Sequence, residues 1–273
     1  MSTRYAVIGN PIEHSKSPLI HAAFARETGQ DLVYERILGD LDGFEQAVHA
    51  FFAAGGGGLN VTVPFKERAW AIVDERGTAA ETAGAVNTLV PLAGRRLRGE
   101  NTDGIGLVRD LRDNHGFDFG GKRLLMLGAG GAARGCLRPL LETGPAELVI
   151  ANRTASKARD LAAGLAALGP VSGRGLEALG ADGFDLIVNA TSAGLSGVTP
   201  DLPPGCLADG GWAYDMLYGE RRTPFCRWAE SVGAARALDG LGMLVEQAAE
   251  SFRIWRGMRP STGPVIEMLR GLR

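Results

Sequence analysis

The chain is poor in cysteine and histidine. Its three cysteines, Cys136, Cys206 and Cys226, are far apart, odd in number and form no C-x-x-C pair. We therefore expect small buried thiols in a reducing compartment, and neither a disulfide framework nor a zinc site. The four histidines show no ligand spacing such as H-E-x-x-H, so no metal site is predicted.

Long apolar runs and an excess of charge are missing as well. No stretch approaches the ~20 apolar residues that a membrane-spanning helix needs. The N-terminal segment "MSTRYAVIGNPIEHSK" turns polar too early for a signal peptide. The net charge of −2 draws the chain neither to nucleic acid nor to an anionic membrane. We expect a soluble, cytoplasmic protein with small-molecule partners.

Glycine is the residue that the chain has in excess. The 273 residues include 40 glycines, roughly twice the ordinary usage, so many tight turns or close backbone approaches are expected. Apolar residues at 45% and charged residues at 22% are values of a globular protein with at least one sizeable core. The length allows one large domain or two of ordinary size.

Apolar runs alternate with helical patterns along most of the chain, which predicts an α/β fold with mainly parallel strands. Strands are expected at 4–9, 33–37, 59–64, 85–91, 123–128, 147–152, 185–190 and 212–216. Helices are expected at 17–29, 42–54, 65–75, 131–143, 155–168 and 223–232, and helical spacing returns at 241–256. The four glycines at 55–58 lack the Lys-Ser/Thr of a P-loop, so we interpret them as a loop between a helix and a strand.

The segment "KRLLMLGAGGAAR" at 122–134 has the pattern of a buried strand, a glycine-rich turn and a helix. Gly128, Gly130 and Ala133 fit G-x-G-x-x-[GA], in which they permit the turn, a close approach to a pyrophosphate and close helix packing. The free N–H groups at the start of the helix favour phosphate. Such turns also occur for steric reasons alone, but the flanking strand and helix, and a second strand ending about 20 residues later, favour a dinucleotide.

The end of that second strand distinguishes between the nicotinamide coenzymes. NAD sites usually place Asp or Glu there to hold the ribose 2′-hydroxyl, whereas "ANRTASKA" offers Asn152, Arg153, Thr154 and Lys157. An arginine fork binds a 2′-phosphate that a carboxylate would repel, so NADP is predicted over NAD. Thr154 also fits an ordinary helix N-cap beside a solvated arginine, and the two roles are compatible. "NATSAG" at 189–194 is either a polar turn or an edge of the nicotinamide site.

The first hundred residues contain candidates for a substrate site. In "GNPIEHSKSPLIHAAF" at 9–24, Ser15 and Ser17 lie where a helix begins. Two hydroxyls at a helix start suit a carboxylate, although the local pattern alone favours ordinary capping by Ser17.

"NVTVPFKE" at 60–67 is more informative, because it puts Lys66 in the first turn of a helix. The positive end of the helix dipole disfavours a cation there, so a surface lysine would gain nothing from the position. We expect Lys66 to act as an acid or base. "AVNTL" and "ENTDG" add Asn87 and Asp103, although Asp103 also fits a simple turn before Gly104.

These motifs, in this order, resemble the shikimate dehydrogenases, NADP-dependent enzymes of aromatic amino-acid biosynthesis. The resemblance covers nearly the whole chain and rests on "GNPIEHSKSP", "NVTVPFKE", "GAVNTL", "NTDGIG", "GAGGAARG", "NRT", "NATSAG", "YDMLYGERRTPF" and "DGLGMLVEQAA". It implies a substrate-binding and catalytic α/β domain formed by 1–103 and 240–273, and a Rossmann-type NADP-binding domain at 104–239. The C-terminal helices would return to the first domain, with a cleft between the two domains.

The resemblance also implies a role for each candidate residue. Lys66, paired with Asp103, would be the catalytic acid and base. Substrate-binding residues would be Ser15 and Ser17 at the carboxylate, with Thr62, Asn87, Asp103, Tyr218 and Gln247 at hydroxyls or the carboxylate. Cofactor-binding residues would be Gly128, Ala129, Gly130, Gly131 and Ala132 at the pyrophosphate, Asn152, Arg153, Thr154 and Lys157 at the 2′-phosphate, and Met216 and Gly240 beside the nicotinamide. Many members carry an acidic residue nine positions before Asn87, where this chain has Thr78, a departure that affects one minor contact on the coenzyme side.

The implied reaction is the reversible reduction of 3-dehydroshikimate to shikimate by NADPH. A quinate/shikimate dehydrogenase paralogue that accepts NAD is the nearest alternative, and Thr62 and the "NRT" motif without an acidic residue disfavour it. A non-catalytic NADP-binding regulator would be expected to have lost Lys66 or Asp103, and a kinase would need a G-K-[ST] motif. The sequence leaves monomer and homodimer open.

Overall fold

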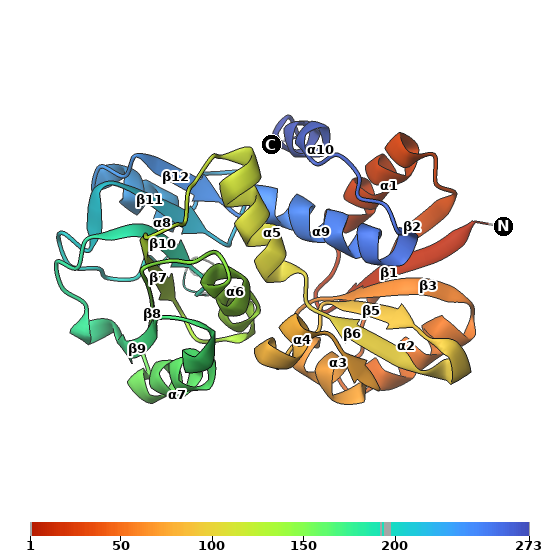
Figure 1. The fold of residues 1–273 in the computed structure, drawn as a ribbon. Helices are drawn as coiled ribbons and strands as arrows, with labels where there is room; N and C mark the ends of the chain where they lie inside the picture. Colours follow the sequence, from red (N-terminus) through yellow and green to blue (C-terminus); the bar gives the residue numbers. More distant parts are fainter. Residues whose placement is uncertain (1, 192, 194–197, 273) are drawn as a thin grey trace. The chain divides into compact units, whose positions relative to one another are not determined.

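The computed structural model describes residues 2–191, 193 and 198–272, which form two compact units, each with its own sheet (Figure 1). Unit 1 consists of the chain up to Gly106 together with Leu244–Leu269, and unit 2 consists of Leu107–Met243 with the chain from Arg270 onward. The chain passes from one unit to the other within helix α5 (Asp103–Arg109) and again within helix α9 (Leu241–Arg256). The helices after residue 240 therefore belong mainly to unit 1.

The sheet of unit 1 is mixed, with three parallel and two antiparallel strand pairs, and the expectation of mainly parallel strands holds over the two sheets together. Its six strands lie in the order β2-β1-β3-β5-β6-β4. They are β1 (Thr3–Gly9), β2 (Leu32–Leu38), β3 (Gly56–Val61), β4 (Glu75–Arg76), β5 (Thr88–Pro91) and β6 (Leu97–Glu100). β5 pairs antiparallel with both β3 and β6, while β1 pairs parallel with β2 and β3. The connection from β5 to β6 is too short for a parallel crossover, so it forms a hairpin.

Helices cover both faces of this sheet, with α1 and α9 on one face and α2 and α3 on the other (Figure 1). The helices of unit 1 other than α5 and α9 are α1 (Ser17–Thr28), α2 (Phe44–Ala53), α3 (Lys66–Ile72), α4 (Thr78–Ala83) and α10 (Gly263–Arg270). On the α2 and α3 face, Phe44 and Phe65 stack at 4.6 Å in a core with Ile8 and Leu59. The opposite face holds an aromatic cluster around Tyr34 and Trp255.

The four glycines at 55–58 are not the predicted loop, because three of them form the start of strand β3. Gly55 has a φ of +84° and makes the turn after α2, and the strand begins at Gly56. A Cβ at Gly56 would lie 2.2 Å from the Phe51 ring, and a Cβ at Gly58 would lie 2.4 Å from the Trp255 ring. The strand lacks side chains here because rings from two helices occupy the space.

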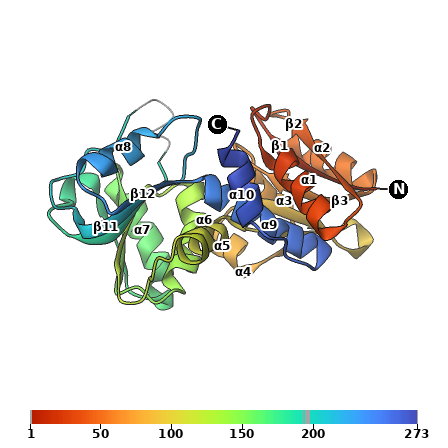
Figure 2. The same cartoon turned by 90° about the horizontal axis from the view of Figure 1, so that it is seen from above.

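Unit 2 has a fully parallel six-stranded sheet in the order β12-β11-β10-β7-β8-β9. The strands are β7 (Arg123–Leu127), β8 (Glu147–Asn152), β9 (Val171–Gly175), β10 (Phe184–Asn189), β11 (Leu207–Asp215) and β12 (Arg236–Asp239). Figure 2 shows helix α8 (Pro224–Ser231) on one side of the sheet and helices α6 (Gly131–Leu141) and α7 (Ala155–Leu165) on the other. This is the predicted Rossmann-type arrangement. The strand order reverses between β7 and β10, and ligands bind at the carboxyl ends of such neighbouring strands.

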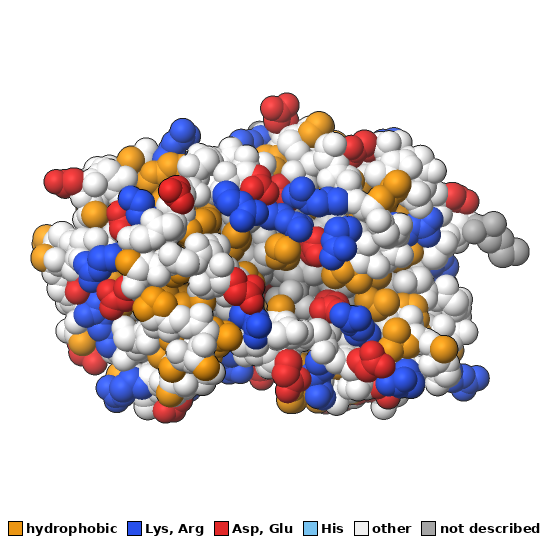
Figure 3. Space-filling view, viewed as in Figure 1, with side chains coloured by type: hydrophobic (Ala, Val, Ile, Leu, Met, Phe, Trp, Pro, Cys, Tyr) orange, Lys and Arg blue, Asp and Glu red, His pale blue; other side chains and the backbone are white. Residues whose placement is uncertain are grey.

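The described residues bear on the expectations about cysteines, membrane-spanning helices, metal sites and surface charge. All three cysteines are free and buried, as predicted. No described helix has the length and apolar character to cross a membrane. Within the described part of the chain, no three His, Cys, Asp or Glu side chains gather as a metal site would require. Acidic and basic side chains are interspersed on the face drawn in Figure 3, in keeping with the balanced composition.

Candidate active site

The structure brings Lys66 and Asp103 into direct contact, although 37 residues separate them in the sequence. Lys66 is the first residue of α3 and Asp103 is the first residue of α5. Lys66 Nζ lies 2.6 Å from Asp103 Oδ2, and the two side chains are 21% and 9% exposed. An ammonium group has three donors, so this lysine retains hydrogens for a ligand oxygen while it is paired. The pair is thus shielded yet reachable from solvent.

Asp103 is held in one orientation by its neighbours. Its second oxygen, Oδ1, accepts a hydrogen bond of 2.8 Å from the Asn87 amide, so each carboxylate oxygen has its own partner. The backbone N–H of Asp103 donates to Asn101 Oδ1, and Asn101 is in turn anchored to the carbonyl of Ala85. The turn that was the alternative explanation for Asp103 is therefore made by Asn101. It leaves the Asp103 carboxylate directed at Lys66.

The Asn87 amide is fully engaged within the protein. Its oxygen accepts from the backbone N–H of Thr102 at 3.0 Å and from the Thr88 hydroxyl at 2.9 Å. Its nitrogen donates to Thr102 Oγ1 as well as to Asp103. Direct contact with a substrate hydroxyl would require one of these bonds to be exchanged. In this structure Asn87 therefore orients the acidic partner of Lys66.

A buried polar network lies behind these residues, and the sequence patterns did not indicate it. The Tyr34 hydroxyl donates to Asn60 Oδ1 at 2.7 Å, and Asn60 Nδ2 donates to Ser251 Oγ at 3.0 Å and to Thr88 Oγ1. His21 stacks on Tyr34 with ring centroids 4.1 Å apart. Burial lowers the pKa of His21 to about 3, so the ring stays neutral at physiological pH. The hydrogen bonds that join Tyr34, Asn60, Thr88 and Ser251 fix the positions of these side chains.

The remaining substrate candidates of unit 1 lie between β1 and the start of α1 (Ser15, Ser17), directly after β3 (Thr62) and within α9 (Gln247). Ser15 Oγ accepts from the backbone N–H of Ser17 at 3.3 Å, and no side chain caps α1, so Ser17 does not act as the predicted cap. Arg36, which the sequence did not single out, donates two hydrogen bonds to the carbonyl of Ser15. Gln247 on α9 accepts from the Thr102 hydroxyl at 3.3 Å, which connects it to the network. Thr62 follows β3, and its backbone N–H donates to the carbonyl of Ile8.

The glycine-rich turn of unit 2 contains two kinds of glycine. Gly128 has a φ of +106°, a conformation that other residues rarely adopt, so it is required for the turn itself. Gly130 and Gly131 have ordinary conformations, and a Cβ on either would meet no atom within 4 Å. Ala133 is fully buried on α6, as the third position of the motif requires. The space beside Gly130 and Gly131 at the start of α6 is free of protein atoms within 4 Å, as close approach of a phosphate group would require.

This difference leads to a prediction for Gly130→Ala. The added methyl group meets no protein atom, and alanine is a poorer N-cap than glycine, so we expect the free energy of unfolding to fall by no more than about 1 kcal/mol. The same methyl group occupies the space left for a phosphate, so the Kd for NADPH should rise about tenfold or more. Thermal unfolding and a fluorescence titration measure the two quantities. Gly164→Ala in α7, which also meets open space, is the matched control: it should leave the Kd for NADPH unchanged, and because alanine favours a helix it should raise the free energy of unfolding by up to about 1 kcal/mol. Unchanged NADPH affinity in Gly130→Ala would contradict the assignment.

The residues predicted for the 2′-phosphate lie together at the carboxyl end of β8. Arg153, Thr154 and Lys157 are all exposed or partly exposed, and Asn152 Nδ2 donates to the carbonyl of Thr154 at 3.1 Å. Thr154 occupies the N-cap position of α7, but its side chain makes no capping hydrogen bond, contrary to that part of the prediction. Two cations and a hydroxyl beside a helix start suit a phosphate dianion.

Met216 and Gly240, predicted beside the nicotinamide, lie next to each other in unit 2. A Cβ at Gly240 would lie 2.3 Å from the carbonyl oxygen of Met216, so only glycine fits there. Tyr218 follows in the same segment and is 37% exposed. In "NATSAG", Asn189 is buried, whereas Ser192 and Gly194 lie outside the described residues. Thr78, the departure from the family pattern, is the first residue of α4, and its carbonyl accepts from the Thr82 hydroxyl.

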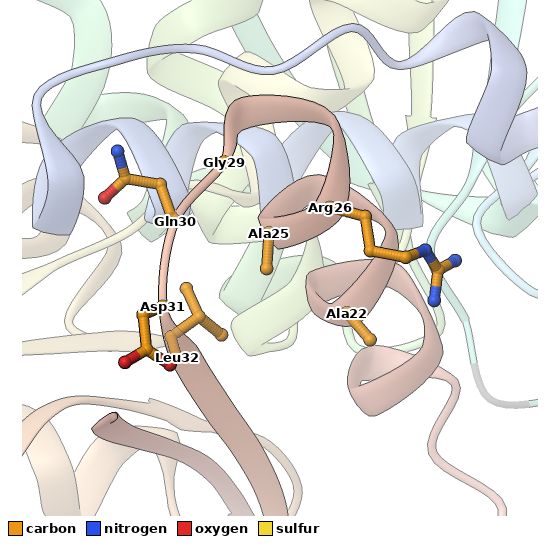
Figure 4. A pocket seen from close by; sticks show the side chains of 7 residues that line it. All are labelled: Ala22, Ala25, Arg26, Gly29, Gln30, Asp31 and Leu32. Carbon is orange, nitrogen blue, oxygen red and sulfur yellow. The ribbon is translucent and has the colours of Figure 1, made fainter. Parts of the chain in front are cut away.

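A separate hollow in unit 1 contains none of the candidate residues. It has a volume of about 450 Å³ and is lined by Ala22, Ala25, Arg26, Gly29, Gln30, Asp31 and Leu32. Figure 4 shows Arg26 and Asp31 on opposite sides of it. Gln30 is already bonded to Arg256. No set of polar groups converges here as in a ligand site.

Comparison with known proteins identifies the family. Residues 7–89 match the shikimate dehydrogenase substrate binding domain, residues 111–200 the shikimate / quinate 5-dehydrogenase family, and residues 240–270 the shikimate 5′-dehydrogenase C-terminal domain. A protein of Alkalilimnicola ehrlichii named shikimate dehydrogenase (NADP(+)) is 60% identical over 270 residues, with 99% of each chain covered. The chain belongs to the shikimate dehydrogenase family.

Two solved structures are similar to this chain over nearly its whole length, which is consistent with its place in the shikimate dehydrogenase family. The Ael1 enzyme from Pseudomonas putida is 49% identical, with a TM-score of 0.91 and 98% of each chain covered. A shikimate 5-dehydrogenase from Thermus thermophilus, solved in complex with NADP(H) and shikimate, is 34% identical, with a TM-score of 0.87. That comparison covers 99% of this chain and 100% of the other. The α/β fold with a substrate-binding domain and a Rossmann-type domain, predicted from the resemblance, is confirmed.

Proposed function

We propose that the chain catalyses the reversible reduction of 3-dehydroshikimate to shikimate by NADPH, a step towards aromatic amino acids. The observation that carries the proposal is the Lys66–Asp103 pair, held at 2.6 Å and oriented by Asn87. The names of the relatives, shikimate dehydrogenase (NADP(+)), support the same reaction. A non-catalytic descendant would have no reason to retain this pair.

Unit 1 is proposed to bind the substrate, in line with a catalytic domain of 1–103 and 240–273. Ser15 and Ser17 bind the carboxylate, and the positive charge of Arg36 at the Ser15 carbonyl supports an anion there. Thr62, Asn87, Asp103, Tyr218 and Gln247 contact substrate hydroxyl groups or the carboxylate, and Asn87 exchanges one of its internal hydrogen bonds to do so. The satisfied network behind Asn87 keeps these groups in place before the substrate arrives, which reduces the entropic cost of the reaction.

Lys66 is the proposed acid and base. Bound NADPH supplies the hydride that reduces the ketone. Lys66 donates a proton to the oxygen on which negative charge develops, and it accepts that proton in the reverse direction. Asp103 holds the ammonium group in position through Oδ2 and stabilises its charge while Asn87 fixes the carboxylate. Proton transfer by a positioned group contributes typically about 10²–10⁴-fold to a rate.

Unit 2 is proposed to bind NADP(H), in line with a coenzyme domain of 104–239. The residues from Gly128 to Ala132 would hold the pyrophosphate, and the space beside Gly130 and Gly131 supports this. Arg153, Thr154, Lys157 and Asn152 would hold the 2′-phosphate, while Met216 and Gly240 would lie beside the nicotinamide. Cytoplasmic location and a monomer or homodimer complete the proposal, the location being supported by three free cysteines.

Absorbance at the reduced-nicotinamide band tests the function directly. Purified protein is mixed with shikimate or quinate, each with NADP⁺ or NAD⁺, and the four initial rates are compared. We expect the combination of shikimate and NADP⁺ to be the fastest. Faster turnover of quinate with NAD⁺ would favour the paralogous activity, and no turnover in any combination would contradict the proposed function.

A further inference from the structure

Three polar side chains lie side by side at the carboxyl-terminal ends of neighbouring strands in the sheet of unit 2. Asn189 ends β10, Asp215 ends β11 and Asp239 ends β12, and the register pairs Asn189 with Asp215 and Asp215 with Asp239. Asn189 begins the "NATSAG" segment, one alternative for which is an edge of the nicotinamide site, whereas neither Asp215 nor Asp239 has an assigned role. The carboxyl edge is where parallel sheets of this type bind their ligands.

Each of the three side chains orders the segment that follows its strand in the same way. A side-chain oxygen accepts the backbone N–H two residues later, at 3.2 Å in each case: Thr191 to Asn189, Leu217 to Asp215 and Leu241 to Asp239. The same turn, closed by a side-chain oxygen, therefore follows each of the three strands. Two of them contain Met216 and Gly240.

Asp215 connects these segments to one another. Its Oδ1 accepts from Asn189 Nδ2 at 3.1 Å as well as from Leu217, so one oxygen joins the end of β10 to the segment after β11. The backbone N–H of Met216 donates to the carbonyl of Asn189, and that of Gly240 donates to the carbonyl of Leu217. The peptides around Met216 and Gly240 are thus fixed from three strands, with Asp215 at the centre.

The carboxyl group of Asp215 lowers the stability of the folded protein at this position. Its side chain is fully buried, and Oδ2 has no hydrogen-bond partner of good geometry among the described residues. Burial raises the pKa of the Asp215 carboxyl, an increase that the nearby Thr223 hydroxyl and the donors to Oδ1 offset only in part. A buried oxygen that is poorly satisfied costs stability, so packing alone does not account for a carboxyl group here.

We propose that Asp215 is a positioning residue for the nicotinamide half of the coenzyme. Its Oδ1 accepts from the N–H of Leu217, which follows Met216, and the carbonyl of Leu217 in turn accepts from the N–H of Gly240. This inference rests on the proposed function of unit 2. It assigns Asp215 no contact with the coenzyme. The adenosine end, bound at β7 and β8, lies on strands that Asp215 does not touch, so the two halves of the coenzyme should respond differently to its loss.

The test compares two ligands in the full-length protein, NADPH and 2′-phospho-ADP-ribose, which lacks the nicotinamide. For Asp215→Ala we expect the Kd of NADPH to rise about tenfold, because two donors lose their acceptor, while the Kd of 2′-phospho-ADP-ribose stays within about twofold. Asp215→Asn keeps an acceptor oxygen for both donors and should restore NADPH binding to within about threefold of the parent. Titration calorimetry measures both constants.

Asp185→Ala is the matched control. It removes a carboxylate that accepts a backbone N–H, from Arg123, at the opposite edge of the same sheet, and it should leave both constants unchanged. Should Asp215→Ala fail to fold, Asn189→Ala carries the same test, because it removes one donor to Oδ1 and leaves the carboxyl group in place. We expect NADPH binding alone to weaken in that variant as well.

Two results would overturn the inference: NADPH affinity that does not change, or equal weakening of both ligands, which would mean that Asp215 only stabilises unit 2. Failure of the proposed function gives a different result. In that case the unsubstituted protein binds neither ligand, whatever the variants do.

Discussion

Replacement of Lys66 by alanine should lower kcat by about 10²–10⁴-fold, because the variant has no group that can transfer a proton at this position. NADPH binding should remain intact, since every proposed coenzyme contact lies in unit 2 whereas Lys66 lies in unit 1. The loss should therefore appear in turnover and not in the Kd for NADPH. Steady-state rates with shikimate and NADP⁺, together with a fluorescence titration of NADPH, measure the two quantities.

The control for Lys66→Ala is Lys122→Ala. Lys122 also pairs with a carboxylate, Asp185 at 3.3 Å, but it lies in unit 2 away from the candidate residues. Its removal should leave kcat unchanged within about twofold, as expected for an exposed ion pair. Turnover of Lys66→Ala within about tenfold of the parent would show that another group is the acid.

Replacement of Arg153 by alanine should raise the KM for NADPH about 10–100-fold, because a charge-assisted hydrogen bond to the 2′-phosphate is lost. NADH lacks that phosphate, so its KM should stay almost unchanged. The preference of the protein for NADPH over NADH should fall by the same factor. Initial rates with both coenzymes at saturating 3-dehydroshikimate give this ratio directly.

Arg159→Ala is the matched control, because Arg159 is also an exposed arginine on α7 but lies beyond the residues assigned to the phosphate. It should change the KM for NADPH by less than about threefold, because salt screens an exposed charge that does not contact the phosphate. An equal rise of KM for NADPH and NADH in Arg153→Ala would remove the assignment of the 2′-phosphate.

Strong local patterns predicted the elements that carry the coenzyme candidates. The strand and helix around the glycine-rich turn were expected at 123–128 and 131–143, and β7 and α6 span Arg123–Leu127 and Gly131–Leu141. These strands are buried on both faces, so their sequences are almost continuously apolar. The prediction needed no information from distant parts of the chain.

The missed strands have a common physical cause. β4, β9 and β12 lie at the edges of their sheets, where one side of the strand has no neighbour. Edge strands are short and partly solvated, so "ER", "VSGRG" and "RALD" contain no apolar run. The fourth, β6, is half of the hairpin with β5, and its "LRGE" has the same weakness. Tertiary pairing makes these segments strands, and local propensity does not.

For the candidate site, the sequence predicted the individual residues but not the contacts between them. Lys66, Asn87 and Asp103 stand in motifs that can be recognised along the chain, but their hydrogen bonds to one another cannot. The bond between Asn60 and Ser251 joins residues that are 191 positions apart, and nothing in the sequence around either residue indicates that they meet. The four glycines were misinterpreted for the same reason, because the Trp255 ring that explains Gly58 comes from the other end of the chain.

That glycine-rich beginning of β3 has a consequence for Lys66. Arg4 pairs with Gly56 and Tyr5 pairs with Gly58, so Gly57 is an extra residue that sets the alignment of β3 against β1. A strand advances roughly 3.3 Å per residue. If β3 shifted by one residue against β1, Lys66, which follows β3, would move by more than the 2.6 Å that separates its Nζ from Asp103 Oδ2. The Phe51 and Trp255 rings, which pack against the backbone of Gly56 and Gly58, therefore help to fix the strand register that brings Lys66 to Asp103.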